Sequence, residues 1–331
     1  MQSVRTKHIV TFVRQGGGHV IFGSKSCFLL HSLGHKLNST SCVLSERTFT
    51  FDLIRGYMQY QSIPGYTIVE MLTTGHFGHV FRVRGESETS DSILKLVHEE
   101  VVQSKLRGMG SSVNVLDEFR IVAMCRHQHI IETNVSFRLG PFLCMEFEDA
   151  VGGDAMAFIL RFGVMENTIA KTFFMEMSNA LVHVHEKKIA HRDVKLENIF
   201  MSSRSLPLIH FQLGDFGLAR RALEYAGCTT FCGTEHYIAP EIFKSRRSLR
   251  SYGQQVDIWS LGISLLVALT GEHPYDEGDL CEQVQTGRII WPSNLNSLWL
   301  RALRAMCEPD DMTRALAHEI HARAISISEH M

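Results

Sequence analysis

The segment at residues 191–198, His-Arg-Asp-Val-Lys-Leu-Glu-Asn, constrains this chain more than any other feature of its sequence. Asp-Phe-Gly follows at 215–217, and Ala-Pro-Glu follows at 239–241. A His-Arg-Asp triplet alone occurs by chance, but three such motifs in this order are hard to assemble accidentally. A purely structural use of so many polar residues is disfavoured, because buried unpaired charge is costly. The motifs therefore predict one site that is built from distant parts of the chain.

The side chains of these motifs suit the transfer of a phosphoryl group. Asp193 can take a proton and orient a hydroxyl nucleophile, and Lys195 can neutralise charge on the moving phosphate. Asn198 and Asp215 carry the hard oxygen ligands that Mg²⁺ prefers on a triphosphate. We therefore predict Asp193 and Lys195 as catalytic residues, and Asn198 and Asp215 as metal ligands.

Together the motifs resemble those of eukaryotic protein kinases of the serine/threonine type, and the resemblance runs from about Tyr66 to Arg314. It implies an α+β fold of two lobes, a small antiparallel β lobe with one main helix and a larger, mainly helical lobe. It also implies ATP and Mg²⁺ as cofactors, and transfer of the γ-phosphate to serine or threonine hydroxyls of proteins. The residue pattern agrees, since apolar residues alternate through 66–97 and recur at helical spacing in 170–185.

Three regions are expected along the chain. Residues 1–64 form an N-terminal extension, 65–148 the small lobe, and 149–331 the large lobe with a truncated last helix. Two interpretations of residues 1–64 stay open: a partly ordered regulatory tail, which we favour, or a remnant of a phosphopeptide-binding β-sandwich. Short strands are expected at 19–22 and 48–51. The insertion at about 101–114 is expected to be a loop.

The resemblance also implies a nucleotide site in the small lobe. The segment 73–80, Thr-Thr-Gly-His-Phe-Gly-His-Val, matches a glycine-rich phosphate loop, although Thr73 stands where the family has glycine. Lys95 takes the place of the lysine that pairs with the α- and β-phosphates, and Glu118 that of its helix partner. Ile93 replaces the small residue that covers adenine, which narrows the pocket or shifts the base slightly. The full set of expected nucleotide-binding residues is Leu72, Gly75, Gly78, Val80, Ile93, Lys95, Glu118, Met145, Glu146, Glu148, Asp154 and Phe200.

Within that set the resemblance gives each residue of the lobe junction a role. Met145 is the gatekeeper, and the backbone from Glu146 to Glu148 bonds the adenine edge. Asp154 bonds a ribose hydroxyl, and Phe200 packs beneath adenine.

A regulatory site is expected between the Asp-Phe-Gly and Ala-Pro-Glu motifs. Thr230 falls where an activating phosphate sits, facing Arg192 and Arg220, with Thr229 as its competitor. A loop that is ordered without phosphate is the structural alternative.

The resemblance further implies contacts that hold the site together. Thr234 should contact Asp193 and Lys195, Glu241 should pair with Arg314, and His191 and Phe216 should stack between the lobes. Asp257 should anchor the backbone of the catalytic loop.

Lys195 and the Gly-Thr-Glu at 233–235 favour a serine/threonine kinase over a tyrosine kinase, nearer the calcium/calmodulin-dependent and checkpoint branches than the mitogen-activated one. Glu197 and Asp154 are expected to meet basic residues upstream of the acceptor in a protein substrate. Activation would come from another kinase or from self-phosphorylation. The main rival is a pseudokinase scaffold, which Thr73, Ile93 and the unusual C-terminal residues favour. A small-molecule kinase is disfavoured because such enzymes generally lack the Ala-Pro-Glu segment.

Composition limits the partners and the compartment. Among 331 residues, 33 Lys+Arg against 35 Asp+Glu give a net charge of −2, so no global field favours nucleic acid or a membrane surface. Eight cysteines without a Cys-x-x-Cys pair argue against zinc and favour reduced thiols inside a cell, in cytoplasm or nucleus. No secretory signal is expected, because Arg14 breaks the first apolar stretch. The apolar segment 258–269 is too short to span a bilayer and predicts a buried helix.

Overall fold

The computed structural model describes residues 10–13, 19–22, 63–75, 78–108, 115–203, 209–221, 233–243, 252–275 and 279–330. The chain divides into two compact units, Met1–Pro64 and Gly65–Met331. In the first unit, β1 (Val10–Val13) and β2 (His19–Phe22) form an antiparallel pair. The strand expected at 19–22 is therefore present, whereas the one expected at 48–51 lies outside the described residues.

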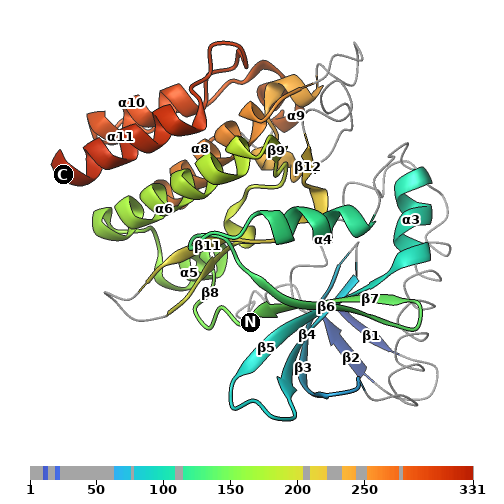
Figure 1. Cartoon of the computed structure of the whole chain (residues 1–331). Helices are drawn as coiled ribbons and strands as arrows, with labels where there is room; N and C mark the ends of the chain where they lie inside the picture. The colour runs from blue at the N-terminus through green and yellow to red at the C-terminus, as the bar shows by residue number, and fades with distance from the viewer. Residues whose placement is uncertain are drawn as a thin grey trace, which may run out of the picture. The chain divides into compact units, whose positions relative to one another are not determined.

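The second unit begins with a five-stranded antiparallel sheet (Figure 1). Its order is β3-β4-β5-β7-β6. The strands are β3 (Tyr66–Gly75), β4 (Gly78–Gly85), β5 (Asp91–His98), β6 (Thr133–Leu139) and β7 (Phe142–Glu148). Along β5, Ser92, Leu94 and Leu96 are buried, while Ile93 and Lys95 are half-buried. Because side chains alternate along a strand, Ile93 and Lys95 share one face of the sheet.

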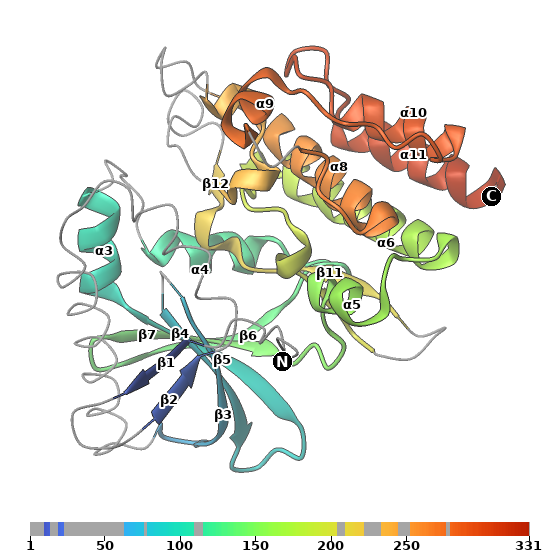
Figure 2. The ribbon, with the colours of Figure 1, turned by 180° about the vertical axis from the view of Figure 1, so that it is seen from behind.

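Two helices belong to this lobe, α3 (Glu99–Gly108) and α4 (Val115–Met124). The expectation of a loop at 101–114 is therefore wrong over most of its length. Residues 99–107 contain neither glycine nor proline, and Glu99 and Glu100 lie in the first turn, where acids favour the helix dipole. Figures 1 and 2 show α4 between the sheet and the helices of the large lobe.

The large lobe is mainly helical, which confirms the two-lobed α+β fold. Its helices are α5 (Ala155–Phe162), α6 (Asn167–Glu186), α8 (Gln255–Thr270), α9 (Leu280–Thr286), α10 (Ser297–Met306) and α11 (Ala317–His330). Its short strands are β8 (Gly153–Asp154), β9 (Ile189–Ala190), β10 (Ile199–Met201), β11 (Phe211–Leu213) and β12 (Arg220–Arg221). The last helix, α11, buries Ile320, Ala324 and Ile327.

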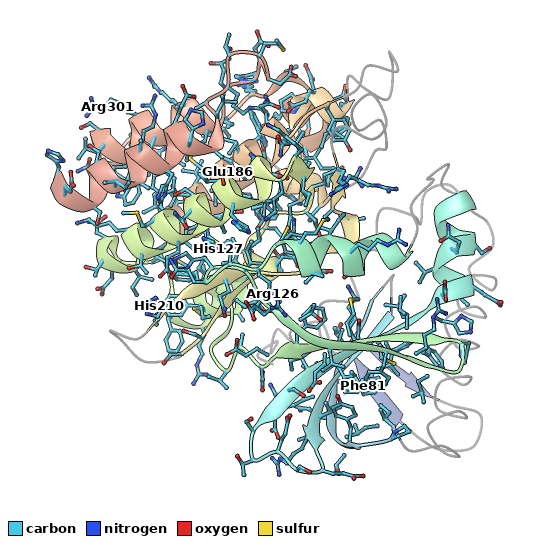
Figure 3. The ribbon with its side chains drawn as sticks, in the orientation of Figure 1. Phe81, Arg126, His127, Glu186, His210 and Arg301 are labelled. Atoms are coloured by element: carbon cyan, nitrogen blue, oxygen red, sulfur yellow. The ribbon has the colours of Figure 1, made fainter. Side chains whose placement is uncertain are left out.

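The loop at 125–132, between α4 and β6, ties the small lobe to the large one. The amide of Ile131 donates to the carbonyl of Leu213 at 2.9 Å, and the amide of Leu213 donates to the carbonyl of His129 at 2.9 Å. The ring of His127 stacks on His183 of α6, with centroids 4.9 Å apart. Figure 3 labels His127 in this loop, next to the helices of the large lobe. Since β11 leads directly to Asp215, this loop couples the position of α4 to that of the second motif.

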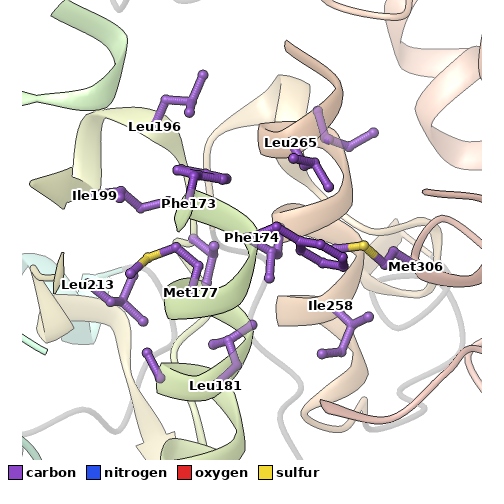
Figure 4. Packing of buried hydrophobic residues seen from close by; sticks show 14 of the residues in the cluster. Phe173, Phe174, Met177, Leu181, Leu196, Ile199, Leu213, Ile258, Leu265 and Met306 are labelled. Carbon is purple, nitrogen blue, oxygen red and sulfur yellow. The ribbon is translucent and has the colours of Figure 1, made fainter. Parts of the chain in front are cut away.

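The main core lies in the large lobe, where α6 packs between β11 and α8 (Figure 4). Phe173, Met177 and Leu181 of α6 are fully buried. Every residue of α8 from Val256 to Ala268 is buried, so the helix expected over 258–269 is a core helix. In the part of the chain that the structure describes, no helix is both long and apolar enough to cross a membrane.

A buried ion pair joins the Ala-Pro-Glu motif to the segment before α11, as the sequence predicts. The Arg314 guanidinium donates to both oxygens of Glu241, at 2.6 and 2.9 Å. It also donates to the carbonyls of Glu308 and Gln255, and both charged side chains are buried. The bidentate geometry and the extra hydrogen bonds offset much of the cost of removing the two charges from water.

We expect Arg314→Met to lower the free energy of unfolding by about 3–5 kcal/mol, because Glu241 would be left buried without its cation. Chemical denaturation measures this change. Arg301→Met is the control, since Arg301 lies exposed on α10 (Figure 3) and should change stability by less than about 0.5 kcal/mol. Equal losses in the two variants would contradict a structural role for the pair.

Candidate active site

A fully buried carboxylate, Asp257 of α8, holds the backbone of the 191–198 segment. Its oxygens accept hydrogen bonds from the amides of Arg192 at 2.7 Å and His191 at 2.8 Å, and His185 Nε2 lies 2.9 Å away. Burial alone would raise the pKa of Asp257, but the hydrogen bonds from His185 and from the Arg192 amide hold it below its usual value. Arg192 has φ of 68°, which a non-glycine residue adopts only at a cost. Asp257 therefore fixes the loop in a conformation that it would not favour alone.

Four polar side chains converge just after this anchor. Lys195 Nζ lies 2.7 Å from Asp193 Oδ2, and Asn198 Nδ2 donates to the same oxygen at 2.9 Å. The Thr234 hydroxyl donates to Asp193 Oδ1 at 3.0 Å and accepts from Lys195 Nζ at 2.7 Å. The predicted contacts of Thr234 are confirmed. The Asp193 carboxylate is thus oriented by three groups and already holds a hydroxyl at hydrogen-bonding distance.

A second charged cluster, centred on Lys95, faces the first from the small lobe. Lys95 Nζ lies 2.5 Å from Glu118 Oε1 and 3.0 Å from Asp215 Oδ1. Burial would lower the pKa of Lys95, but the two carboxylates outweigh it and raise the pKa, so Lys95 stays cationic. Lys95 is also the main cause that lowers the pKa of Asp215 to about 2. For Glu118, burial prevails over Lys95 and raises the pKa.

The oxygen donors fit a magnesium ion that phosphate groups would complete. The Asp215 side chain remains 47% exposed beside Lys95, and its φ of 56° is left-handed. The Asn198 amide nitrogen faces Asp193, which leaves its oxygen as the atom that can meet a cation. Among the described residues, no group of three or more His, Cys, Asp or Glu side chains could hold a metal unaided. Mg²⁺ is commonly held by one or two protein oxygens plus substrate phosphates, which matches this sparse set.

His191 and Phe216 pack against each other, as expected of the predicted stack. Their rings lie 4.6 Å apart, edge to face, and His191 Nε2 lies 3.1 Å from the carbonyl of Gly214. Burial lowers the pKa of His191, which favours the neutral ring. A Cβ at Gly214 would lie 2.8 Å from the ring of Phe200, so glycine is required for this close packing. Phe200 also pairs with Asp154 across β10 and β8, which brings these two expected nucleotide contacts together.

The sheet register determines which side chains share the face of the sheet that carries Lys95. Lys95 pairs with Val80 on one side and with Met145 on the other. Ile93 pairs with Phe147, so Phe147 lies on the same face as Ile93 and Lys95. Phe147 was missed in the sequence, although its spacing of two residues from Met145 was a usable signal.

The glycine-rich hairpin has one position that only glycine can fill. Gly78 has φ of 153°, and a Cβ there would lie 2.2 Å from the carbonyl oxygen of Leu96. Gly75 pairs with Gly78 across the hairpin, and residues 76–77 between them lie outside the described residues. Leu72 and Thr73 are exposed on β3.

The remaining predicted residues are placed as follows. Glu148 is exposed at the end of β7, whereas the side chain of Glu146 is buried. Asp154 caps α5, where its Oδ1 accepts from the amide of Ala157 at 2.8 Å. Arg192 donates through Nε to the carbonyl of Leu218 at 2.7 Å. Arg220 pairs with Ala190 across β12 and β9, close in the chain to Arg192. Thr230 and Thr229 lie outside the described residues.

Comparison with known proteins agrees with this geometry. The protein kinase domain family matches residues 66–324. Human serine/threonine-protein kinase ULK3 is 30% identical over 234 residues, which are 69% of this chain and 47% of that protein. Serine/threonine-protein kinase akt-1 of Caenorhabditis elegans is 27% identical over 239 residues, 71% of this chain and 42% of that protein. Protein kinase kin1 of Schizosaccharomyces pombe is 25% identical over 276 residues, which are 78% of this chain and 30% of that protein.

The chain thus spans about half or less of the length of these curated relatives, which carry the names of several different kinases at similar identities. The comparison therefore resolves the family and not one branch of it. With the matched region covering most of the chain, this protein belongs to the protein kinase domain family, and its relatives are serine/threonine kinases.

Proposed function

We propose that this protein transfers the γ-phosphate of ATP, with Mg²⁺, to serine or threonine hydroxyls of protein substrates. The observation that carries the proposal is the convergence of Lys195, Asn198 and Thr234 on the Asp193 carboxylate, within 2.7–3.0 Å. Membership of the kinase family implies ATP and protein substrates. The assignment of serine or threonine rests on Lys195 and Thr234, which bridge to each other in the pattern that the serine/threonine resemblance implies. Within the superfamily, the calcium/calmodulin-dependent or checkpoint-like branch stays our prediction.

Each residue has one task in this proposal. Asp193 accepts the proton of the acceptor hydroxyl, and Lys195 contacts the transferred phosphate. Lys95, held by Glu118, pairs with the α- and β-phosphates. Bound through Asn198 and Asp215, magnesium would neutralise charge on the triphosphate.

A pseudokinase scaffold is the alternative that Thr73 and Ile93 favour. Both lie on the face of the sheet that carries Lys95, where they would affect the fit of a nucleotide. Neither removes a charged group from the two clusters, because Lys95, Glu118 and Asp215 make their ion pairs. We therefore favour turnover over scaffolding.

We expect Asp193→Asn to lower phosphate transfer by about 10² or more, the range in which general-base removal falls. Labelled ATP, Mg²⁺ and a degenerate serine/threonine peptide library measure transfer, and calorimetry should find ATP binding nearly unchanged. Asp311→Asn, a control far along the chain near α11, should transfer at the parent rate. Parent-like transfer by Asp193→Asn would show that Asp193 is not the base.

One acid in the catalytic loop is placed to bind a cation from a substrate. Glu197 Oε2 is buried beside the Tyr237 hydroxyl, and among the described residues no cation pairs with it. Burial and then Glu197 raise the pKa of Tyr237, so the tyrosine stays neutral and supplies no positive charge to Glu197. Asp154 already caps α5, which makes Glu197 the better partner for a basic residue upstream of the acceptor.

We therefore expect Glu197→Gln to lower kcat/KM by roughly 30-fold for a peptide with arginine upstream of the acceptor, since a buried charge pair would lose one partner. A peptide with alanine in place of that arginine should be phosphorylated equally by parent and variant. Measuring both peptides with both proteins gives the result directly. An equal loss with the two peptides would contradict recognition of the cation by Glu197.

Regulation by phosphate on Thr230 is proposed from its position in the sequence and from the two arginines expected to face it. Arg220 pairs with Ala190 across two strands, and Ala190 is close in the chain to Arg192. We expect Thr230→Ala to lower activity by about tenfold or more even with an activator, because one to three charge-assisted hydrogen bonds would be lost. Thr229→Ala should retain activity. Mass spectrometry of the active protein accompanies the assays, and full activity with neither threonine phosphorylated would rule out the switch.

A further inference from the structure

The side chain of Glu146 is buried at the end of β7 and is 5% exposed. Its Oε1 accepts a hydrogen bond from Ser92 Oγ at 2.6 Å, and its Oε2 accepts one from the Tyr66 hydroxyl at 2.7 Å. In the part of the chain that the structure describes, no basic side chain pairs with this carboxylate. Two hydroxyl groups therefore supply the hydrogen bonds that a buried carboxylate requires.

The backbone of the same residue is held from another strand. Thr133 Oγ1 of β6 donates to the carbonyl of Glu146 at 3.0 Å, and Glu146 pairs with Leu94 of β5 and Val135 of β6. Tyr66 itself stacks on Phe137 of β6, with ring centroids 6.0 Å apart and planes 5° apart. Glu146 is thus tied to β3, β5 and β6 as well as to its own strand.

The two hydroxyl donors come from two different strands of the sheet. Ser92 is buried in β5, three residues before Lys95, and its side chain lies on the opposite face of the sheet from Lys95. Tyr66 begins β3, 80 residues before Glu146 in the chain. Burial and then Glu146 raise the pKa of Tyr66 well above its usual range, so the phenol remains a donor. Removing either hydroxyl would leave one oxygen of a buried carboxylate unsatisfied, and the end of β7 would have to shift to solvate it.

The end of β7 is also the segment whose backbone would bond the adenine edge. We propose that the Tyr66 and Ser92 hydroxyls, acting through the Glu146 carboxylate, position this backbone and so set the affinity of the protein for the adenosine part of ATP. The inference rests on the proposed binding of ATP. Tyr66, Ser92 and the Glu146 side chain are positioning residues, because they lie behind the sheet face that carries Lys95 and do not touch the reacting groups.

The test compares Tyr66→Phe and Ser92→Ala with the parent, using adenosine and magnesium tripolyphosphate as separate competitors of ATP. In each variant adenosine should bind about five- to tenfold more weakly, and tripolyphosphate should bind as in the parent. KM for ATP should rise by a similar factor, while kcat stays within about twofold. This split distinguishes positioning of the adenine site from a general loss of structure.

Two matched controls each remove a buried hydroxyl from the large lobe. Ser264→Ala removes a hydroxyl that donates to the carbonyl of Ser260 within α8, and Tyr275→Phe removes a buried phenol hydroxyl next to Trp259. Both should bind adenosine as the parent does. Thermal melting of every variant monitors folding, and Tyr66→Phe carries the test if Ser92→Ala is unstable, because Tyr66 is only half-buried.

The possible failures are distinguishable. A parent protein that binds neither adenosine nor ATP would overturn the proposed function and this inference together. A parent that binds both, with variants that bind adenosine equally well, would overturn the inference alone. Equal weakening of adenosine and tripolyphosphate would also overturn it, since the hydroxyls would then serve only general stability.

Discussion

One cation, the ammonium of Lys95, joins three parts of the fold that are remote in sequence. It lies between the Glu118 carboxylate of α4 and the Asp215 carboxylate that follows β11. A buried lysine without partners would lose its charge, but two carboxylates keep it protonated. The position of α4, the left-handed backbone at Asp215 and the small-lobe strand β5 are therefore mutually dependent. Asp257 has the same function for the catalytic loop, where a buried anion fixes two backbone amides.

These two anchors explain how bulkier side chains on the Lys95 face of the sheet can coexist with intact charged clusters. Thr73 and Ile93 depart from the family pattern on the sheet face that carries Lys95, where side chains would shape the space for a nucleotide. Lys95 lies on the same sheet face as Ile93, but Glu118 and Asp215 hold its ammonium group, so a bulkier side chain nearby need not disturb it. Within this account, such departures alter nucleotide affinity and selectivity more than the capacity to transfer phosphate.

Contacts inside the motifs could be predicted from the sequence, because each motif has fixed spacing and a definite chemical task. Thr234 with Asp193, Glu241 with Arg314, and Asp257 with the loop backbone are examples. Contacts that depend on strand register could not be predicted. Tyr66, Ser92 and Glu146 meet only because three strands align, and Phe147 shares the sheet face of Ile93 and Lys95 for the same reason. Helix α3 was missed because its sequence is mainly polar, and its helical character rests on composition and acidic first-turn residues.

The central claim is that the assembled clusters turn over ATP and do not merely bind it. The most direct measurement follows ATP binding and phosphate transfer in one sample of the purified chain, with and without Mg²⁺, and then identifies the phosphorylated amino acid. The account predicts productive ATP binding that depends on Mg²⁺ and label recovered on serine or threonine. Tight binding of magnesium ATP without label on any peptide or protein would contradict it and would identify the chain as a scaffold.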